Sequence, residues 1–395
     1  MRIYADNAAT TKISKRAAEA MTVCMEDLFG NPSSLHADGQ KAAEALKAAR
    51  ESIAANIGCT EKEIYFTSGG SESDNQAIIS AAMYGKARGK RHIITTAFEH
   101  HAVLHTVRKL EKEGFEVTYL DVHGNGIVNP AELEAAIRED TALVTVMYAN
   151  NEIGTIQPID KIGEICSRRK VLFHTDAVQA AGHIDIDVER SKVDYLSLSA
   201  HKFHGPRGIG VLYARKRNQL FTLIEGGAQE RSRRAGTENL PAIVGMAAAL
   251  EEACEKMRDN SIKATSLRNR LIDGLLKIPH TVLNGDTAHR LPGNVNVCFE
   301  GIEGESLLLL LDMKGISASS GSACTSGSLD PSHVLLAIGR PHEIAHGSLR
   351  LTLDESNTES EIDTIISSVT EVVDRLRKMS PVWDDLEKGI KKHVI

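Results

Sequence analysis

Stretches rich in apolar residues alternate, through the first half of the chain, with stretches whose apolar positions repeat about every 3.6 residues. The apolar stretches lie at 63–69, 91–97, 115–122, 141–150, 171–178, 194–200 and 208–215. They are short and nearly continuous, which is typical of strands buried on both faces of a sheet. The stretches between them, such as ESDNQAIISAAMYGKARG and PIDKIGEICSRRK, have the pattern of amphipathic helices. This half therefore predicts an α/β fold, with a mostly parallel sheet covered by helices on both faces.

The pattern changes after a helix rich in alanine and glutamate, which we expect near residues 240–258. Beyond it, strands are expected at 294–300, 315–323 and 347–353, and helices at 304–314 and 358–379. This mixture predicts a smaller α+β unit. We expect a large domain over 15–258 and a small C-terminal domain made of 1–14 and 259–395.

Composition and charge exclude several classes of protein. The chain has 395 residues and a net charge of −7, so it lacks the basic surface of a nucleic-acid-binding protein. No apolar run approaches the ~20 residues that a membrane helix needs, and MRIYADNAATTK lacks the pattern of a signal peptide. The six cysteines are scattered without a C-x-x-C pair. Their spacing argues against a zinc site or a disulfide framework, and predicts a reducing cytoplasm.

Polar residues follow four of the expected strands, and the carboxyl ends of parallel strands are where such sheets bind ligands. In TSGGSESDN, a strand runs into Gly69, Gly70 and Ser71 and then into a helix. Glycines let backbone N–H groups approach an anion, and a helix N-terminus adds about half a positive charge. The segment is either a phosphate-binding turn or an ordinary capped helix, because it matches neither common glycine-rich phosphate motif.

The second and third strand ends offer a carboxylate and a lysine. Asp176 ends a strand in FHTDAVQA, with Gln179 three residues later, and Lys202 follows Ser199 and His201 in SLSAHKFHGPRGIG. A carboxylate at a nearly buried strand end needs a cation or a donor, which leaves a buried cap as the alternative to a functional role. A lysine in such a position is either a desolvated nucleophile and base or an ordinary surface lysine.

The fourth strand end is rich in histidine. In AFEHHAVLH, His100 is the first histidine after the strand and is placed to offer its flat ring to a cofactor. His101 and His105 are four residues apart, but no H-E-x-x-H motif and no set of cysteines or carboxylates completes a metal site around them. We therefore expect no resident metal. We interpret His204 as a residue that supports the site or lies at the surface.

A phosphate-binding turn, a carboxylate, a lysine and a flat ring are together what pyridoxal 5'-phosphate (PLP) requires. Its aldehyde bonds covalently to a lysine, its phosphate needs N–H and hydroxyl donors, and its pyridine nitrogen needs a carboxylate partner. The strand ends therefore predict a PLP enzyme, whose large domain binds the cofactor.

The chain resembles the cysteine desulfurases of the NifS/IscS branch of the class-V aminotransferase family, with features of the nitrogen-fixation type. The resemblance covers nearly the whole chain, and the motifs that carry it are YADNAATT, GNPSSLH, TSGGSESDN, EHHAVL, ANNEIGTIQP, HTDAVQ, SAHKFHGP, RRAGTEN and SSGSACTS. It implies the PLP-dependent transferase fold of type I. It also implies conversion of L-cysteine to L-alanine, with the sulfur passing to iron–sulfur cluster assembly or to other acceptors.

The resemblance implies a role for each candidate residue. Lys202 is the lysine that bonds to the cofactor, Asp176 is the partner of the pyridine nitrogen, and His100 stacks on the ring and handles protons. Gln179 bonds the phenolic oxygen, and Arg350 binds the substrate carboxylate. Asn151 is implied to lie near cofactor and substrate. The residues implied to hold the phosphate are Gly70, Ser71, Ser199, His201 and, from the second subunit of a homodimer, Thr237.

Cys324 lies in ASSGSACTSGSLDP, a run of small and polar residues with no apolar period. From the residues alone, it is either a chance cysteine in a surface loop or a reactive thiol. The resemblance implies the second: Cys324 is the cysteine of a mobile loop, 318–333, that accepts the sulfur as a persulfide. It also implies an iron–sulfur scaffold protein of the NifU/IscU type as acceptor, on which Cys324 transiently contacts a cluster.

Two other functions stay open on the sequence alone. A different PLP enzyme of the same fold, such as an aminotransferase or a selenocysteine lyase, shares every feature except the need for Cys324. A non-enzymatic sulfur carrier or scaffold is the other alternative, and bound cofactor argues against it.

Overall fold

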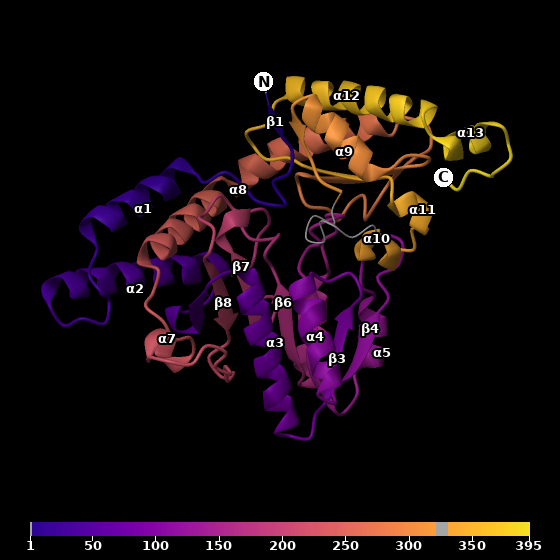
Figure 1. Cartoon of the computed structure of the whole chain (residues 1–395). Helices are drawn as coiled ribbons and strands as arrows, with labels where there is room; N and C mark the ends of the chain where they lie inside the picture. Colours follow the sequence, from indigo (N-terminus) through magenta and orange to yellow (C-terminus); the bar gives the residue numbers. More distant parts are fainter. Residues whose placement is uncertain (1, 321–330) are drawn as a thin grey trace.

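The computed structural model of the chain describes residues 2–320 and 331–395 (Figure 1). Its largest sheet has seven strands in the order β2-β8-β7-β6-β5-β3-β4. The strands are β2 (Ile64–Thr67), β3 (His92–Thr96), β4 (Glu116–Leu120), β5 (Thr141–Thr145), β6 (Leu172–Asp176), β7 (Tyr195–Ser199) and β8 (Gly210–Ala214). Each lies inside one of the seven apolar stretches of the first half, so the strand predictions are confirmed.

The sheet is mostly parallel, as the sequence predicts. Strands β4, β3, β5, β6 and β7 pair in parallel, whereas β8 is antiparallel to both of its neighbours, β7 and β2. Two reversals in succession leave β2 pointing in the same direction as β7. The carboxyl ends of six strands therefore meet at one edge of the sheet.

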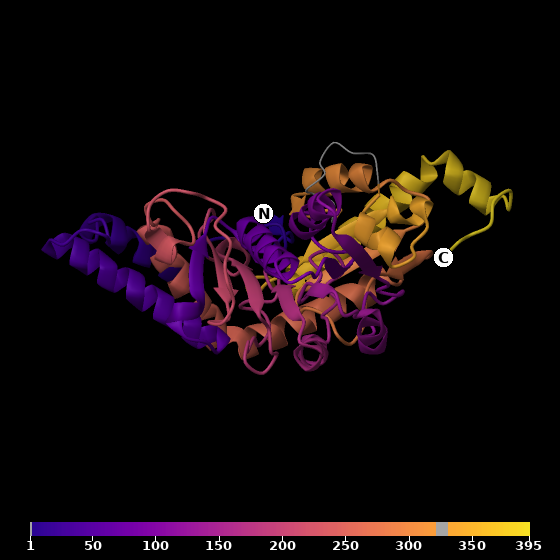
Figure 2. The same cartoon turned by 90° about the horizontal axis from the view of Figure 1, so that it is seen from below.

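Helices cover both faces of this sheet, as Figure 2 shows from below. Side chains alternate between the faces along each strand: Ile93 and Leu143 belong to one core cluster, and their neighbours Ile94 and Val144 to another. The first cluster packs against α3 (Gly70–Lys86) and α4 (His101–Lys112). The opposite face packs against α2 (Ala37–Ile57), α6 (Ile159–Arg169) and the beginning of α8 (Leu240–Leu275). The remaining elements here are α1 (Lys15–Asp27), α5 (Pro130–Ala136), α7 (Gln229–Ser232) and the short helices η1 (Glu61–Glu63) and η2 (Ala200–Lys202).

The C-terminal part forms a second core around an antiparallel sheet of order β12-β10-β9. Its strands are β9 (Thr281–Leu283), β10 (Asn294–Phe299) and β12 (Ser348–Thr352), and its helices are α9 (Gly304–Met313), α12 (Glu359–Lys378) and α13 (Pro381–Glu387). The short helices α10 (His333–Ala337) and α11 (His342–Ala345) of this part place their buried apolar side chains in the core of the large sheet instead. The expected strands at 294–300 and 347–353 and both expected helices are confirmed.

The expected strand at 315–323 differs from the structure. Within the described residues it is only β11 (Ile316–Ser317), which pairs in parallel with β1 (Ile3–Tyr4) instead of joining the antiparallel sheet. Ile3 and Ala5 consequently pack in the core of the C-terminal part. The chain therefore begins in the small unit before it enters the large one, an arrangement that depends on a long-range pairing.

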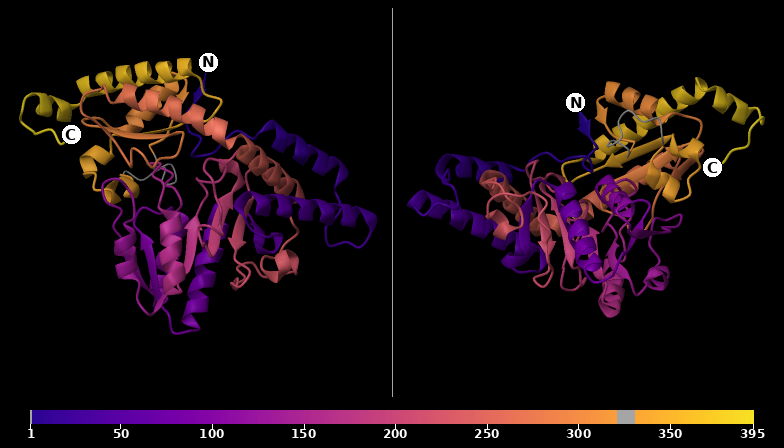
Figure 3. Two further views of the ribbon diagram at one scale, coloured as in Figure 1. Left: turned by 180° about the vertical axis from the view of Figure 1, so that it is seen from behind. Right: turned by 60° about the horizontal axis from the view of Figure 1, so that its bottom comes forward.

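Helix α8 is 36 residues long and continues well past the end expected near 258. Met246 and Leu250 pack in the core of the large sheet, whereas Leu267 and Leu271 pack in the core of the C-terminal part. Figure 3 shows the helix running from one body into the other. Packing at both ends outweighs the weak helix preference of the polar residues near its middle. The domain boundary at 258/259 falls inside α8 and stays a prediction.

Among the described residues, no helix combines the length and the apolar composition that crossing a bilayer requires.

Candidate active site

A cavity of about 460 Å³ lies at the carboxyl edge of the large sheet, where β12 of the small unit approaches it. Most of the residues singled out from the sequence line it: Gly70, Ser71, His100, Asn151, Asp176, Gln179, Ser199, His201, Lys202 and Arg350. The fold explains this convergence. Asp176 and Ser199 are the last residues of the adjacent strands β6 and β7, and Gly70 follows β2, which ends at the same edge.

Asp176 places a buried carboxylate on the cavity wall, with 5% of the residue exposed. Its Oδ1 accepts a hydrogen bond of 2.9 Å from the backbone N–H of Val178. Burial, and secondarily the nearby carboxylate of Asp74, raises the pKa of Asp176 to about 7. A carboxylate desolvated to this extent favours a cationic partner, and the protonated pyridine nitrogen of PLP fits that requirement.

Asp74 is a cavity residue that the sequence analysis missed. It lies on α3, four residues after Gly70 and therefore on the same side of the helix. Burial raises its pKa to about 7. Its Oδ1 has no hydrogen-bond partner among the described residues and lies 3.5 Å from Nε2 of His174. The helical spacing within TSGGSESDN is the signal that could have revealed it.

Lys202 reaches the cavity from η2, directly after β7. Its Nζ donates hydrogen bonds of 2.6 Å to the carbonyl oxygen of Ala8 and 2.8 Å to that of Ala9. Gln179 Nε2 donates to the same Ala8 oxygen at 3.0 Å. The N-terminal segment YADNAATT thus orients two candidate residues through its backbone, a role that side-chain chemistry could not indicate.

His100 is the N-cap of α4, and its Nδ1 accepts a hydrogen bond of 3.1 Å from the backbone N–H of Ala102. This bond fixes the plane of the ring. Burial, followed by the nearby charge of Lys202, lowers the pKa of His100 to about 4, so the ring is neutral at physiological pH. A neutral, oriented ring at the cavity wall suits stacking on a flat cofactor.

The beginning of α3 has the geometry of an anion-binding turn. A Cβ on Gly70 would lie 2.7 Å from Cγ2 of Val178, so glycine is required for the close approach of this backbone. The acidic Glu72 in the first turn is engaged by Arg234, whose Nε lies 2.9 Å from its Oε1. Hydroxyls of Ser71 and Ser199 complete a set of donors that fits a phosphate.

Arg350, on β12 of the small unit, brings a buried guanidinium into the cavity, with 3% of its side chain exposed. Its Nη2 donates to Asp6 Oδ1 at 2.8 Å, and its Nη1 donates to the carbonyl of Asn151 at 3.1 Å. Its Nε is buried without a hydrogen-bond partner among the described residues. An unused donor on a buried cation fits the carboxylate of an amino acid.

Two candidates are not among the described residues that line this cavity. Thr237 is exposed and does not line it, and Cys324 lies outside the described residues. The described cysteines are Cys24, Cys59, Cys166, Cys254 and Cys298, all of them free. Burial raises the pKa of the thiol in each, to about 11 for Cys254 and Cys298, so these thiols stay protonated.

Comparisons with known proteins relate the whole chain to one family. The model of the aminotransferase class-V family matches residues 3–365. The cysteine desulfurase IscS of Methanosarcina thermophila is 56% identical over 380 residues, which cover 96% of this chain and 94% of the relative. IscS of Clostridium botulinum strain Hall is 52% identical, with 98% of each chain covered. Among solved structures, a NifS-like protein superposes with a TM-score of 0.90 at 40% identity, covering 95% of this chain and all of the other.

Proposed function

This chain belongs to the class-V aminotransferase family and is a PLP-dependent cysteine desulfurase, which acts on L-cysteine and passes its sulfur to acceptors; from this premise, we propose which residues perform each task. The observation that carries the proposal is the convergence of Lys202, Asp176 and Arg350 on one cavity. These residues provide a nucleophilic amine, a buried carboxylate and a buried guanidinium with an unused donor.

The proposed roles follow from the geometry. PLP, when bound, supplies a carbonyl that bonds to amines and a ring that withdraws electrons from the attached amino acid. Gly70, Ser71, Ser199 and His201 hold the phosphate, and Gln179 donates to the phenolic oxygen. Asp176 holds a proton at the ring nitrogen, and His100 restricts the ring to one plane.

The chain also binds the substrate and moves its protons. Arg350 orients L-cysteine by a charge-assisted bond to its carboxylate, beside Asn151. Lys202 Nζ, oriented by the carbonyls of Ala8 and Ala9, takes the proton from the α-carbon of the substrate.

We propose Cys324 as the sulfur acceptor, on the basis of its sequence context. Its thiolate attacks the sulfur of L-cysteine, so that an S–S bond forms and the C–S bond breaks. The electron pair of that bond stays on carbon, which gains protons and leaves as L-alanine. Support comes from the other cysteines, because burial keeps their thiols protonated.

The test compares Cys324→Ala with Cys254→Ala in the PLP-loaded protein. Mass spectrometry after one addition of L-cysteine should find a labile sulfur on the peptide containing residue 324 in the wild type and in Cys254→Ala. Cys324→Ala should release alanine several orders of magnitude more slowly, because no thiol in solution matches a positioned nucleophile. Wild-type alanine release by Cys324→Ala would exclude this cysteine as the acceptor.

We further propose a homodimer in which Thr237 serves the phosphate of the neighbouring subunit. Support comes from Thr237 lying outside the cavity of its own chain, and from α1 and the loop after it, which expose Val23, Met25, Phe29 and Leu35. An active monomer in light scattering would contradict this.

We propose that the protein that receives the sulfur from Cys324 is a scaffold protein of the NifU/IscU type. The proposed location is the cytoplasm, which is supported by the described cysteines being free.

A further inference from the structure

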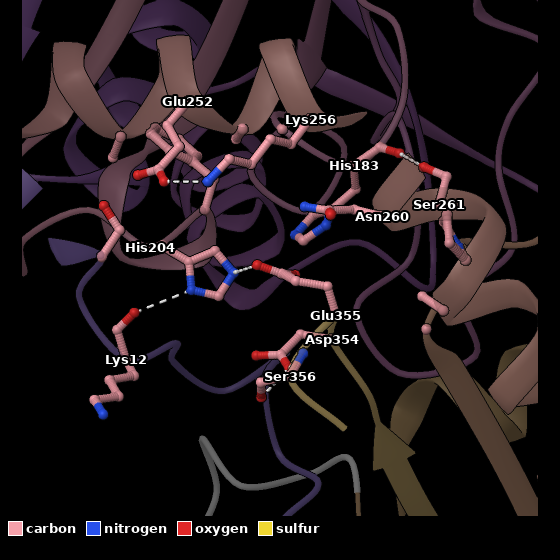
Figure 4. A pocket seen from close by; sticks show the side chains of 18 of the residues that line it. Lys12, His183, His204, Glu252, Lys256, Asn260, Ser261, Asp354, Glu355 and Ser356 are labelled. Atoms are coloured by element: carbon pink, nitrogen blue, oxygen red, sulfur yellow. Dashed lines mark hydrogen bonds and ion pairs between the residues drawn. The ribbon is translucent and has the colours of Figure 1, made fainter. Parts of the chain in front are cut away.

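A second cavity, of about 410 Å³, lies away from the first, between the N-terminal segment, α8 and the turn after β12 (Figure 4). Three of the side chains that line it come from two distant parts of the sequence and lie close together: His204, and the consecutive Asp354 and Glu355. One potential ligand atom from each lies within 4.8 Å of the others. The proposed reaction uses none of the three.

The hydrogen bonds of His204 determine which of its nitrogens faces the carboxylates. Nδ1 lies 3.0 Å from the carbonyl oxygen of Lys12. A carbonyl only accepts, so Nδ1 carries the proton, and in the neutral ring Nε2 presents a lone pair. That lone pair lies 3.8 Å from Oε1 of Glu355, as Figure 4 shows. Two hydrogen-bond acceptors therefore face each other, and this contact is unfavourable unless a cation lies between them or the ring is protonated.

This hydrogen-bond pattern is the one that metal-binding histidines use. Such a histidine usually donates its second N–H to a backbone carbonyl or a carboxylate, which fixes the ring and directs the free nitrogen to the metal. His204 also has φ of 64°, a left-handed conformation that among non-glycine residues is commonest in asparagine, aspartate and histidine. Its backbone N–H donates to Thr11 Oγ1 at 2.8 Å, which helps to hold that conformation.

The carboxylate of Asp354 is also held by hydrogen bonds. Asp354 Oδ1 accepts hydrogen bonds from the backbone N–H and the hydroxyl of Ser356, at 2.8 and 2.6 Å, which orients the carboxylate in the turn. The nearby Lys256 pairs with Glu252 at 2.6 Å and also interacts electrostatically with Glu355. The cluster brings two carboxylates beside one imidazole nitrogen.

We propose that His204, Asp354 and Glu355 form a binding site for a divalent transition-metal ion, with Mn²⁺ as the reference ion. One imidazole and two carboxylates suit Mn²⁺ or Zn²⁺, whereas an all-oxygen site would suit Mg²⁺. From the sequence, His101 and His105 are the only histidines considered as metal ligands, and no resident metal is expected. The separation of His204 from Asp354 and Glu355 in the chain gives no signal of this cluster. The site goes beyond the proposed function and does not depend on it.

The position of the site indicates what the metal does. His204 is two residues after Lys202, and Asp354 is four residues after Arg350. A metal bound to both would join the segment that carries the cofactor lysine to the strand that carries the substrate-binding arginine. It therefore stabilises the relative placement of the two bodies.

A second cluster, His280, Glu300 and His393, serves as the internal control. Its ligand atoms are equally close together, but its rings stack at 3.7 Å with an angle of 17° between their planes. His393 Nδ1 lies 2.8 Å from Glu300 Oε2, and His280 Nδ1 lies 2.6 Å from the backbone oxygen of Ile395. These nitrogens are satisfied without a metal.

The experiment is a titration of the PLP-loaded protein with Mn²⁺ alone, followed by the loss of the electron paramagnetic resonance signal of free Mn²⁺. We expect one tight site per chain. Asp354→Asn and His204→Asn should weaken it by about 100-fold or more, whereas His393→Asn should leave it unchanged. Asparagine at 354 keeps the acceptor for Ser356, and asparagine at 204 tolerates the left-handed backbone, so both variants should fold.

Thermal unfolding with and without Mn²⁺ provides a second measurement. Mn²⁺ should raise the unfolding temperature of the wild type and of His393→Asn, but not that of Asp354→Asn, because only proteins with the site gain binding energy in the folded state. The proposal is overturned if the wild type binds no Mn²⁺, or if binding disappears in His393→Asn and persists in His204→Asn.

Discussion

The two ends of the active-site cavity hold opposite charges in different ways. At the end formed by the large sheet, Asp176 and Asp74 are buried carboxylates, and burial raises the pKa of each to about 7. At the end formed by β12, Arg350 is a buried guanidinium that already binds Asp6 and still has an unused Nε. The carboxylate end therefore favours a cationic ring, and the arginine end favours an anionic carboxylate. Under the proposed roles, the large unit binds the cofactor and the small unit binds the substrate.

The largest expected effect is that of Lys202→Ala, which removes the amine at the carboxylate end. Turnover should fall by about 10⁴-fold or more, since both the covalent attachment and the base are lost. The visible absorption of the bound cofactor should shift to that of free PLP, while Arg350 is untouched. An unchanged spectrum would show that another amine holds the cofactor.

Asp176→Asn tests the carboxylate end directly. Asparagine keeps an oxygen for the Val178 N–H but no longer stabilises a proton on the ring nitrogen. We expect kcat to fall by about 10²- to 10⁴-fold and the cofactor to dissociate more readily in dialysis. The KM for L-cysteine should change little. A change confined to KM would contradict the division of the cavity into two tasks.

Arg350→Lys tests the arginine end by replacing a planar fork with a single point charge. The kcat/KM for L-cysteine should fall by about 10- to 100-fold, mainly through KM, because one charge-assisted hydrogen bond is lost. The absorption spectrum of the bound cofactor should stay as in the wild type. Loss of cofactor in this variant would show that the two ends are not separable.

Asp74→Asn tests whether the buried carboxylate of Asp74, when ionised, destabilises the cofactor-free protein. The folded pKa of Asp74 and of Asp176, about 7, exceeds the ordinary value. The folded state therefore binds more protons than the unfolded state between about pH 4 and 7, and the contribution of these groups to stability falls as pH rises through this range. His100 and His174, whose pKa burial lowers to about 4, act in the opposite direction below about pH 6.5.

The measurement is therefore a difference between two proteins. Urea unfolding of cofactor-free wild type and Asp74→Asn should diverge as pH rises, with the variant gaining about 1 kcal/mol or more in relative stability by pH 7. Parallel pH profiles for the two proteins would show that Asp74 is not destabilising when ionised.

The smallest expected effect is that of Glu72→Gln, beside the phosphate-binding turn. The Arg234–Glu72 pair is partly exposed, so losing it should cost about 1 kcal/mol or less in the free energy of unfolding. Losing the ion pair should loosen the turn and weaken cofactor binding slightly. Removing a negative charge near the helix N-terminus should favour the phosphate slightly, so the two effects on cofactor affinity should nearly cancel. Equilibrium dialysis of PLP should show a change of less than about threefold. A large loss would place Glu72 among the residues that organise the turn.

Local patterns in the sequence predicted the strands of the large sheet and the residues at their ends. Asp176 and Lys202 could be found because a strand end places its side chains at a known edge, whatever the rest of the chain does. Asp74, the carbonyls of Ala8 and Ala9, and the pairing of β11 with β1 could not be found in this way. Each depends on contacts between distant segments, or on backbone atoms that carry no sequence signal. Arg350 was identified by resemblance alone, because its strand belongs to the other unit.

The continuity of α8 has a consequence for how the molecule can be taken apart. A helix that anchors in both cores transmits the melting of either one to the other, so unfolding should be a single cooperative event. A cut at 258/259 would leave each fragment with half of the helix, anchored in its own core but without the anchor at the other end. Fragments of this chain are thus poor candidates for independent expression. A recombination event that exchanged one half would have to keep α8 uninterrupted, with its apolar residues facing the same two cores.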